Sequence, residues 1–170
     1  ADSIVKKLKK DGHDVTIENM MEYLSDIAGI RIICSFTSDI YQIAEMIAHQ
    51  ADVTVLHVKD YIKNPKPNGY KSYHMVVTVP VYLSDGPVET KVEVQIRSVA
   101  MDFWASLEHK IAYKFEGNAP ENLLKELKAC ADIVDMLDAK MFSLNEAITA
   151  YAAEQRRQEE QAAKTEEEFS

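Results

Sequence analysis

The stretch Lys59-Asp-Tyr-Ile-Lys-Asn-Pro-Lys-Pro-Asn-Gly-Tyr-Lys-Ser-Tyr-His74 determines how the rest of the sequence is interpreted. Its two prolines, Asn68 and Gly69 cannot continue a helix or a central strand, which predicts a loop that leads into a strand. The loop carries four lysines and three tyrosines against a single acid, Asp60. Lysines bind phosphate and a tyrosine ring stacks on a base, so this composition fits a nucleotide site. A solvated hairpin loop with core tyrosines fits it equally well.

The overall composition is that of an ordinary soluble globular protein. Hydrophobic residues make up 46% and charged residues 28% of the 170 residues, which suits one domain with a real core and an appendage. The net charge of −9 argues against a protein that coats nucleic acid, and it makes the basic loop stand out. Cys34 and Cys130 lack metal-site spacing, so we expect a reducing, cytoplasmic compartment. No apolar run approaches transmembrane length, and no membrane association is expected.

The segment over residues 88–97 alternates more regularly than any other part of the chain. One face carries Val88, Thr90, Val92, Val94 and Ile96, and the other carries Glu89, Lys91, Glu93, Gln95 and Arg97. Such a polar stripe is typical of the solvated face of an antiparallel sheet. A polar site is the alternative, because His74 returns from the loop onto a neighbouring predicted strand and Asp26 offers a second carboxylate to Glu93.

Apolar periodicity predicts the remaining elements. Further strands are expected over residues 27–34, 53–58 and 72–82, and helices over residues 2–10, 16–24, 38–49 and 99–114. Arg31 interrupts the otherwise buried strand over 27–34, so its head should reach a carboxylate, a phosphate or a ring. Asp26 stands at the mouth of that strand, where α/β proteins place ligand groups. A simple pairing of Asp26 with Arg31 is the alternative.

The C-terminal part of the sequence predicts a long helix from Glu121 to about Gln161, as one or two segments with an apolar face. The stretch over residues 154–170 is polar throughout, and we expect it to fray. An apolar-striped helix on a small α/β core packs either against another subunit or back onto its own core. Both arrangements stay open.

Three segments together resemble the synthetase domain of the RelA/SpoT family in its small, stand-alone form. They are Asp26-Ile-Ala-Gly-Ile-Arg31, the loop over 59–74, and Val92-Glu-Val-Gln-Ile-Arg-Ser98, which continues into Ala100-Met-Asp-Phe-Trp-Ala-Ser-Leu-Glu-His-Lys110. The resemblance implies an α/β (α+β) fold related to nucleotidyltransferases, with a mixed sheet of about five strands flanked by helices and long C-terminal helices. It implies a synthetase domain over residues 1–118 and a helical oligomerisation segment with a polar tail over residues 119–170.

The resemblance also implies an activity, the transfer of pyrophosphate from ATP to the 3′-hydroxyl of GDP or GTP. The products are AMP and the alarmones ppGpp or pppGpp. Two polyanions meet in this reaction, and Mg²⁺ held by carboxylates and phosphates would screen them. By the resemblance, Asp26 and Glu93 are the catalytic acids that hold Mg²⁺, and Glu93 also helps to draw the proton from the 3′-hydroxyl.

The other residues that match the family's motifs fall into a donor and an acceptor group. The resemblance places Arg31 against the adenine of ATP and Lys7 on its triphosphate. Tyr70 would stack on guanine and Asp102 would read the guanine edge. The contacts to the acceptor phosphates and within the loop would come from Lys63, Lys66 and His74.

One part of the family pattern is not in the sequence. The family carries an Arg-x-Lys pair just upstream of the first helix, whereas this sequence starts at Ala1, so we expect residues to precede it. A chain without that pair would be a catalytically impaired relative that binds guanine nucleotides or RNA. An oligomeric scaffold built on residues 121–161 is a third hypothesis, but it leaves the loop unexplained.

The resemblance further implies partners. It predicts a homotetramer that assembles through the C-terminal helices. The resemblance also suggests (p)ppGpp or single-stranded RNA as a regulator of the activity. DNA is not expected as a partner.

Overall fold

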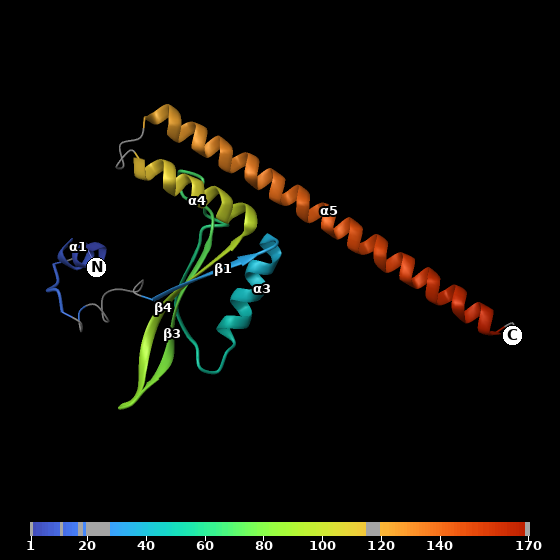
Figure 1. Ribbon diagram of the computed structural model, residues 1–170, viewed down its shortest axis with the longest axis horizontal. Helices are drawn as coiled ribbons and strands as arrows, with labels where there is room; N and C mark the ends of the chain where they lie inside the picture. The colour runs from blue at the N-terminus through green and yellow to red at the C-terminus, as the bar shows by residue number, and fades with distance from the viewer. Residues whose placement is uncertain (1, 11, 17–18, 20–27, 115–119, 169–170) are drawn as a thin grey trace.

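The computed structural model describes residues 2–10, 12–16, 19, 28–114 and 120–168 (Figure 1). The elements in chain order are α1 (Asp2–Lys10), β1 (Ala28–Cys34), α3 (Thr37–Ala48), β2 (Thr54–Asp60), β3 (Tyr73–Leu83), β4 (Gly86–Ser98), α4 (Val99–Lys114) and α5 (Glu121–Glu168). Each strand predicted from periodicity is present, and α4 has the predicted bounds. The short helix predicted over 16–24 lies mostly outside the described residues. Asp26 also lies outside them.

The sheet is mixed, as predicted, with the strand order β1-β4-β3-β2. β1 runs parallel to β4, and the other two pairs are antiparallel. We expected about five strands, and the described residues form four. The fifth strand came from the family resemblance, whereas the sequence pattern itself predicts four strands, the same four that the described residues form. A two-residue turn, Ser84-Asp85, joins β3 to β4, and Gly86 supplies the positive φ of +124° that ends it.

The alternation of β3 and β4 separates an apolar from a polar face. Met75, Val77, Val92, Val94 and Ile96 are buried against Ile40 and Ala44 of α3. Figure 1 shows α3 along one side of the sheet, with α4 and α5 across the end of β4. The opposite face carries the polar side chains, and the parallel register brings Arg31 of β1 beside Gln95 of β4. The predicted facing of β4 is therefore correct.

β1 differs from the prediction of a buried strand. It lies at the edge of the sheet, and Ile30 and Ile33 are more than half exposed. An edge strand has a neighbour on one side only, so its apolar run is not enclosed as that of a central strand would be. Arg31 is accordingly half exposed and avoids most of the cost of burial.

α5 is one helix of 48 residues. The predicted fraying of the polar tail is wrong, because α5 continues to Glu168. Alanine, glutamate, glutamine, lysine and arginine dominate that stretch, and all are strong helix formers. Only the first part of α5 packs on α4, where Ala131 is buried beside Trp104, and the rest extends away from the sheet (Figure 1). None of the helices in the described ranges has the length and apolar character of a membrane span.

Candidate active site

The loop between β2 and β3 is a defined turn held by its own polar groups. The Asp60 carboxylate accepts hydrogen bonds from the backbone N–H of Ile62 at 2.9 Å and of Lys63 at 3.0 Å. Asn68 Oδ1 accepts from the backbone N–H of Tyr70 at 3.1 Å. These side-chain-to-backbone bonds are the means by which Asp and Asn stabilise tight turns. The loop therefore presents its side chains from a fixed backbone.

The loop also rests on α5. Gly69 has a φ of +90°, and a Cβ atom there would lie 2.5 Å from Cβ of Ala131. Both the backbone conformation and the close approach therefore require glycine. The ammonium group of Lys71 pairs with the carboxylate of Asp135 on α5, although the two residues are 64 positions apart in the chain. The position of the loop thus depends on a helix that is distant from it in sequence.

The aromatic and cationic side chains of the loop gather as predicted. The ring centroids of Tyr61, Tyr70 and His74 lie 5.2–6.0 Å apart in edge-to-face contacts. Lys66 Nζ lies 5.0 Å from the ring centre of Tyr61 and 4.8 Å from that of Tyr70. Lys63 does not join this cluster, because its ammonium group contacts Asp60 and the ring of Tyr41 instead.

Glu93 lies in the middle of the polar face and is held on both carboxylate oxygens. His74 Nδ1 lies 3.2 Å from Oε1, and Gln95 Nε2 donates to Oε2 at 3.0 Å. Burial lowers the pKa of His74, the negative charge of Glu93 opposes this shift, and the cations Arg97 and Lys66 add to it. His74 is therefore neutral near pH 7, and its ring carries one N–H.

Arg31 and Asp102 meet on the same face. Arg31 Nη1 lies 3.5 Å from Asp102 Oδ1, and the same oxygen accepts from Arg97 Nη1 at 3.1 Å. The expectation that the Arg31 head reaches a carboxylate is confirmed, with Asp102 as the partner. Asp102 occupies the first turn of α4. The Ser98 hydroxyl accepts from the backbone N–H of Met101 at 3.2 Å and caps this helix.

A cavity of about 380 Å³ opens beside these residues. Its lining consists of Arg31, Tyr70 and Arg97 together with Ala105, Ser106, Glu108, His109 and Lys110 of α4. Its volume is within the range of small-molecule sites, and its walls combine an aromatic ring with cations and a carboxylate. Asp102 is not in the lining, whereas Glu108 is, and Glu108 Oε1 accepts from Asn68 Nδ2 at 3.3 Å. The only sequence signal for Glu108 and His109 was their polar character within the helix predicted over residues 99–114.

Eight of the nine predicted site residues lie in the described part of the chain, and Asp26 lies outside it. Glu93, His74, Tyr70, Lys66, Arg31 and Asp102 come together on the polar face. Lys63 lies to the side of this cluster, and Lys7 lies on α1. Gln95 and Arg97 connect the first group, although the sequence pattern did not distinguish them from the rest of the polar stripe. In the part of the chain that the structure describes, no three His, Cys, Asp or Glu side chains gather as a ready metal site.

Comparisons with known proteins identify relatives over most of the chain. The family model described as "Region found in RelA / SpoT proteins" matches residues 1–118. GTP pyrophosphokinase YwaC of Bacillus subtilis (strain 168) is 48% identical over 147 residues, which are 86% of this chain and 70% of that protein. GTP pyrophosphokinase YjbM of the same organism is 39% identical over 145 residues, which are 83% of this chain and 69% of that protein.

Solved structures agree with these matches. The crystal structure of small alarmone synthetase 2 from Bacillus subtilis has a TM-score of 0.79 and 46% identity, over 86% of this chain and 76% of that one. Small alarmone synthetase 1 from Bacillus subtilis, bound to its product pppGpp, has a TM-score of 0.79 and 36% identity. That match covers 87% of this chain and 75% of the other.

Proposed function

The chain belongs to the RelA/SpoT family, and from this premise we propose that it is a small alarmone synthetase, a GTP pyrophosphokinase. It transfers pyrophosphate from ATP to the 3′-hydroxyl of GDP or GTP and releases AMP. The observation that carries this proposal is the Glu93 carboxylate, fixed on both oxygens beside an aromatic and cationic loop. Two GTP pyrophosphokinases are similar to this chain over 86% and 83% of its length.

The acceptor nucleotide would bind at the loop and the cavity. The Tyr70 ring lines the cavity and offers a flat surface on which guanine can stack. Lys66, exposed and 4.8 Å from the centre of that ring, is placed to meet the acceptor phosphates. His74 then serves the site through its contacts with Tyr70 and Glu93. Lys63 supplies a further cation at the entrance of the loop.

The guanine edge needs a carboxylate that accepts from N1–H and the exocyclic amine. Asp102, our prediction from the resemblance, already accepts from Arg97 and faces Arg31. It keeps lone pairs for further donors, so guanine contact and arginine pairing are compatible. The role therefore stays a prediction for Asp102.

The donor nucleotide would bind at Arg31 and α1. The Arg31 side chain is 50% exposed and contacts Asp102 through one nitrogen, which leaves its planar surface available to adenine. Lys7 on α1 would contact the triphosphate.

The residues present fit Mg²⁺. Glu93 accepts one hydrogen bond on each oxygen, so each oxygen keeps a lone pair for a cation. Mg²⁺ commonly takes one or two protein carboxylates and completes its shell with water and substrate phosphates, and Asp26 is the second acid we propose. When bound, Mg²⁺ neutralises charge on the phosphates. Glu93 itself accepts a hydrogen bond from the 3′-hydroxyl and draws its proton as the oxygen attacks phosphorus.

The decisive experiment is a turnover assay with Mg²⁺, labelled ATP and GDP, followed by separation of the nucleotides. The wild type should form ppGpp and AMP in equal amounts. Glu93→Gln keeps the size of the side chain but removes its charge, so turnover should be lost while GDP still binds. Glu89→Gln is the matched control, because Glu89 lies on the same face of β4 and is exposed. An active Glu93→Gln enzyme would refute the mechanism, and a wild type that binds GDP without turnover would support the impaired relative.

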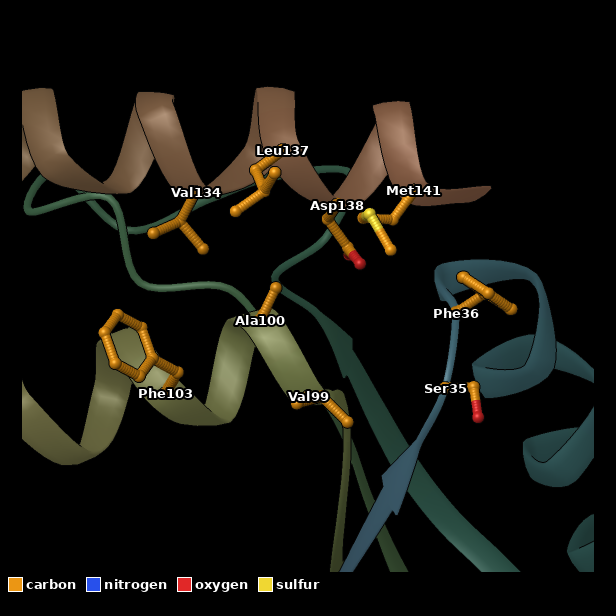
Figure 2. Close-up of a pocket in the computed structure, with 9 residues that line it drawn as sticks. All are labelled: Ser35, Phe36, Val99, Ala100, Phe103, Val134, Leu137, Asp138 and Met141. Atoms are coloured by element: carbon orange, nitrogen blue, oxygen red, sulfur yellow. The ribbon is translucent and has the colours of Figure 1, made fainter. Parts of the chain in front are cut away.

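We also propose that residues 119–170 assemble the chain into a homotetramer. An apolar groove of about 440 Å³ lies between the start of α4, the loop after β1 and α5 (Figure 2). Its apolar wall includes Phe36, Val99, Phe103, Val134, Leu137 and Met141. The apolar stripe continues beyond the groove along α5 through Leu144, Ile148 and Tyr151, each at least half exposed. An apolar surface of this extent on a protruding helix is suited to a second copy of the chain.

Light scattering after size exclusion tests the assembly. The wild type should elute at four times the chain mass of 19.2 kDa. Leu144→Glu with Ile148→Glu should lower that mass, whereas Glu146→Lys on the same exposed stretch should not. A monomeric wild type would refute the proposal. Regulation by (p)ppGpp or single-stranded RNA and a cytoplasmic location stay predictions from the sequence.

A further inference from the structure

Arg97 is a buried cation that the proposed chemistry does not use. It is 5% exposed, it lies at the end of β4, and its guanidinium group faces the polar side of the sheet. Its carbon Cζ lies 5.1 Å from the ring centre of Tyr70. Its Nε is buried and has no hydrogen-bond partner among the described residues. An unpaired buried donor is unfavourable for folding, so this side chain calls for an explanation other than stability.

Two chains of hydrogen bonds run from Arg97 Nη2 to Glu93. In the first, Nη2 donates to the Tyr70 hydroxyl at 2.7 Å, which lies 2.8 Å from His74 Nε2, and His74 Nδ1 lies 3.2 Å from Glu93 Oε1. In the second, Nη2 donates to Gln95 Oε1 at 3.1 Å, and Gln95 Nε2 donates to Glu93 Oε2 at 3.0 Å. The two chains close a ring of five side chains.

The direction of every bond in the ring follows from its ends. The guanidinium group can only donate, and the Glu93 carboxylate can only accept. The Glu93 carboxylate can only accept, so His74 carries its hydrogen on Nδ1 and donates it to Oε1. Nε2 of neutral His74 then has no hydrogen, so it accepts from the Tyr70 O–H, while the Tyr70 oxygen accepts from Arg97. One tautomer of neutral His74 thus completes the ring, and the other breaks it.

We infer that Arg97 is a positioning residue, which holds the Tyr70 ring and the Glu93 carboxylate in one relative geometry. The inference rests on the proposed roles of Tyr70 as the base platform and Glu93 as the catalytic acid. Its consequence is that base stacking and the alignment of the 3′-hydroxyl with Glu93 are linked. A change at Arg97 moves both, although Arg97 itself needs to touch neither the reacting phosphorus nor the hydroxyl.

Arg97→Lys tests this coupling because it keeps the positive charge but loses the planar guanidinium group, whose Nη2 donates to both Tyr70 and Gln95. We expect the KM for GDP to rise and kcat to fall, with kcat/KM for GDP reduced by about tenfold to a hundredfold, the size of a lost charge-assisted hydrogen bond. The KM for ATP should change by less than about twofold. Arg156→Lys, on the exposed part of α5, is the matched control and should behave as wild type.

The tautomer of His74 gives a readout that does not depend on turnover. In ¹⁵N-labelled protein without nucleotide or metal, long-range proton–nitrogen spectra should show His74 with its hydrogen on Nδ1, identified by the signal lost in His74→Gln. Tyr70→Phe keeps the aromatic ring but removes the hydroxyl that donates to Nε2, so the Nε2 resonance should move while Glu93 still holds the hydrogen on Nδ1. Arg97→Lys loses the bond that orients the Tyr70 hydroxyl, so it should move the Nε2 resonance in the same direction. Gln95→Met should lower kcat while this tautomer signal stays.

The outcomes separate this inference from the proposed function. A wild type without ppGpp synthesis would refute the function, whereas the tautomer spectra would still test the ring. An active wild type combined with unchanged kinetics and unchanged His74 spectra in Arg97→Lys would refute the inference alone. A lower melting temperature in Arg97→Lys, with wild-type kinetics and spectra, would show a purely structural role and would also refute it.

Discussion

Gly69→Ala should destabilise the protein, because Gly69 lies where the loop between β2 and β3 contacts α5. The added Cβ would lie 2.5 Å from Cβ of Ala131, in a backbone conformation of φ +90°. An L side chain in the left-handed region costs about 1–2 kcal/mol, and overpacking in a closed interior costs about 1–3 kcal/mol. The sum is a loss of about 2–5 kcal/mol in the free energy of unfolding.

Two further variants separate the backbone term from the contact. Gly12 has a φ of +80°, and nothing lies within 4 Å of the position that a Cβ atom would take there. Gly12→Ala should therefore show the backbone term alone, about 1–2 kcal/mol. Ala131→Gly removes the methyl group that Gly69→Ala would meet, at a cost of about 1 kcal/mol in helix propensity. Combined with Gly69→Ala, it should restore at least about 1 kcal/mol relative to the sum of the single changes.

Urea unfolding of the four variants provides these energies, and GDP titration provides the link to function. Because Gly69 is next to Tyr70, the loop should shift and the KM for GDP should rise in Gly69→Ala, while the KM for ATP changes little. Gly69→Ala that is no more destabilising than Gly12→Ala would refute the reasoning. Additive effects of Gly69→Ala and Ala131→Gly would refute it as well.

Three other predictions follow from single contacts. Tyr70→Ala removes the stacking surface and should raise the KM for GDP by about tenfold or more, with the KM for ATP little changed; unaltered GDP binding would exclude Tyr70 as the platform. Burial and the nearby Asp60 carboxylate raise the pKa of Tyr41 to about 12, so its contribution to stability is complete below about pH 10 and lost as the pH rises to about 12. Urea unfolding across that range should therefore show a shallower alkaline decline in Tyr41→Phe, and an identical decline would contradict this. Asp138 accepts from the hydroxyls of Thr37 at 3.2 Å and of buried Ser98 at 2.8 Å, so Asp138→Ala should lower the free energy of unfolding by about 1–3 kcal/mol. The control Asp132→Ala loses only an exposed ion pair with Lys128 and should lower it by less than about 1 kcal/mol.

The local elements of this fold could be predicted from the sequence because each follows from a short-range pattern. The alternation over 88–97 identified the two faces of β4, and apolar periodicity identified the bounds of α4. The prolines, Asn68 and Gly69 identified the loop. The motifs of the RelA/SpoT family lie within such local segments, which is why the sequence alone was enough to match them to Glu93, Tyr70 and Arg31.

Only the tertiary structure decided how these segments meet. The parallel pairing of β1 with β4 sets Arg31 beside Gln95, and the edge position of β1 leaves it more exposed than its apolar run predicts. The hydrogen-bonded ring of five side chains through Arg97 and the contact of Gly69 with Ala131 join residues that no periodicity connects. Such contacts depend on strand register and helix docking, which are set by the summed packing of the whole chain, whereas turns and amphipathic faces are set by neighbouring residues alone.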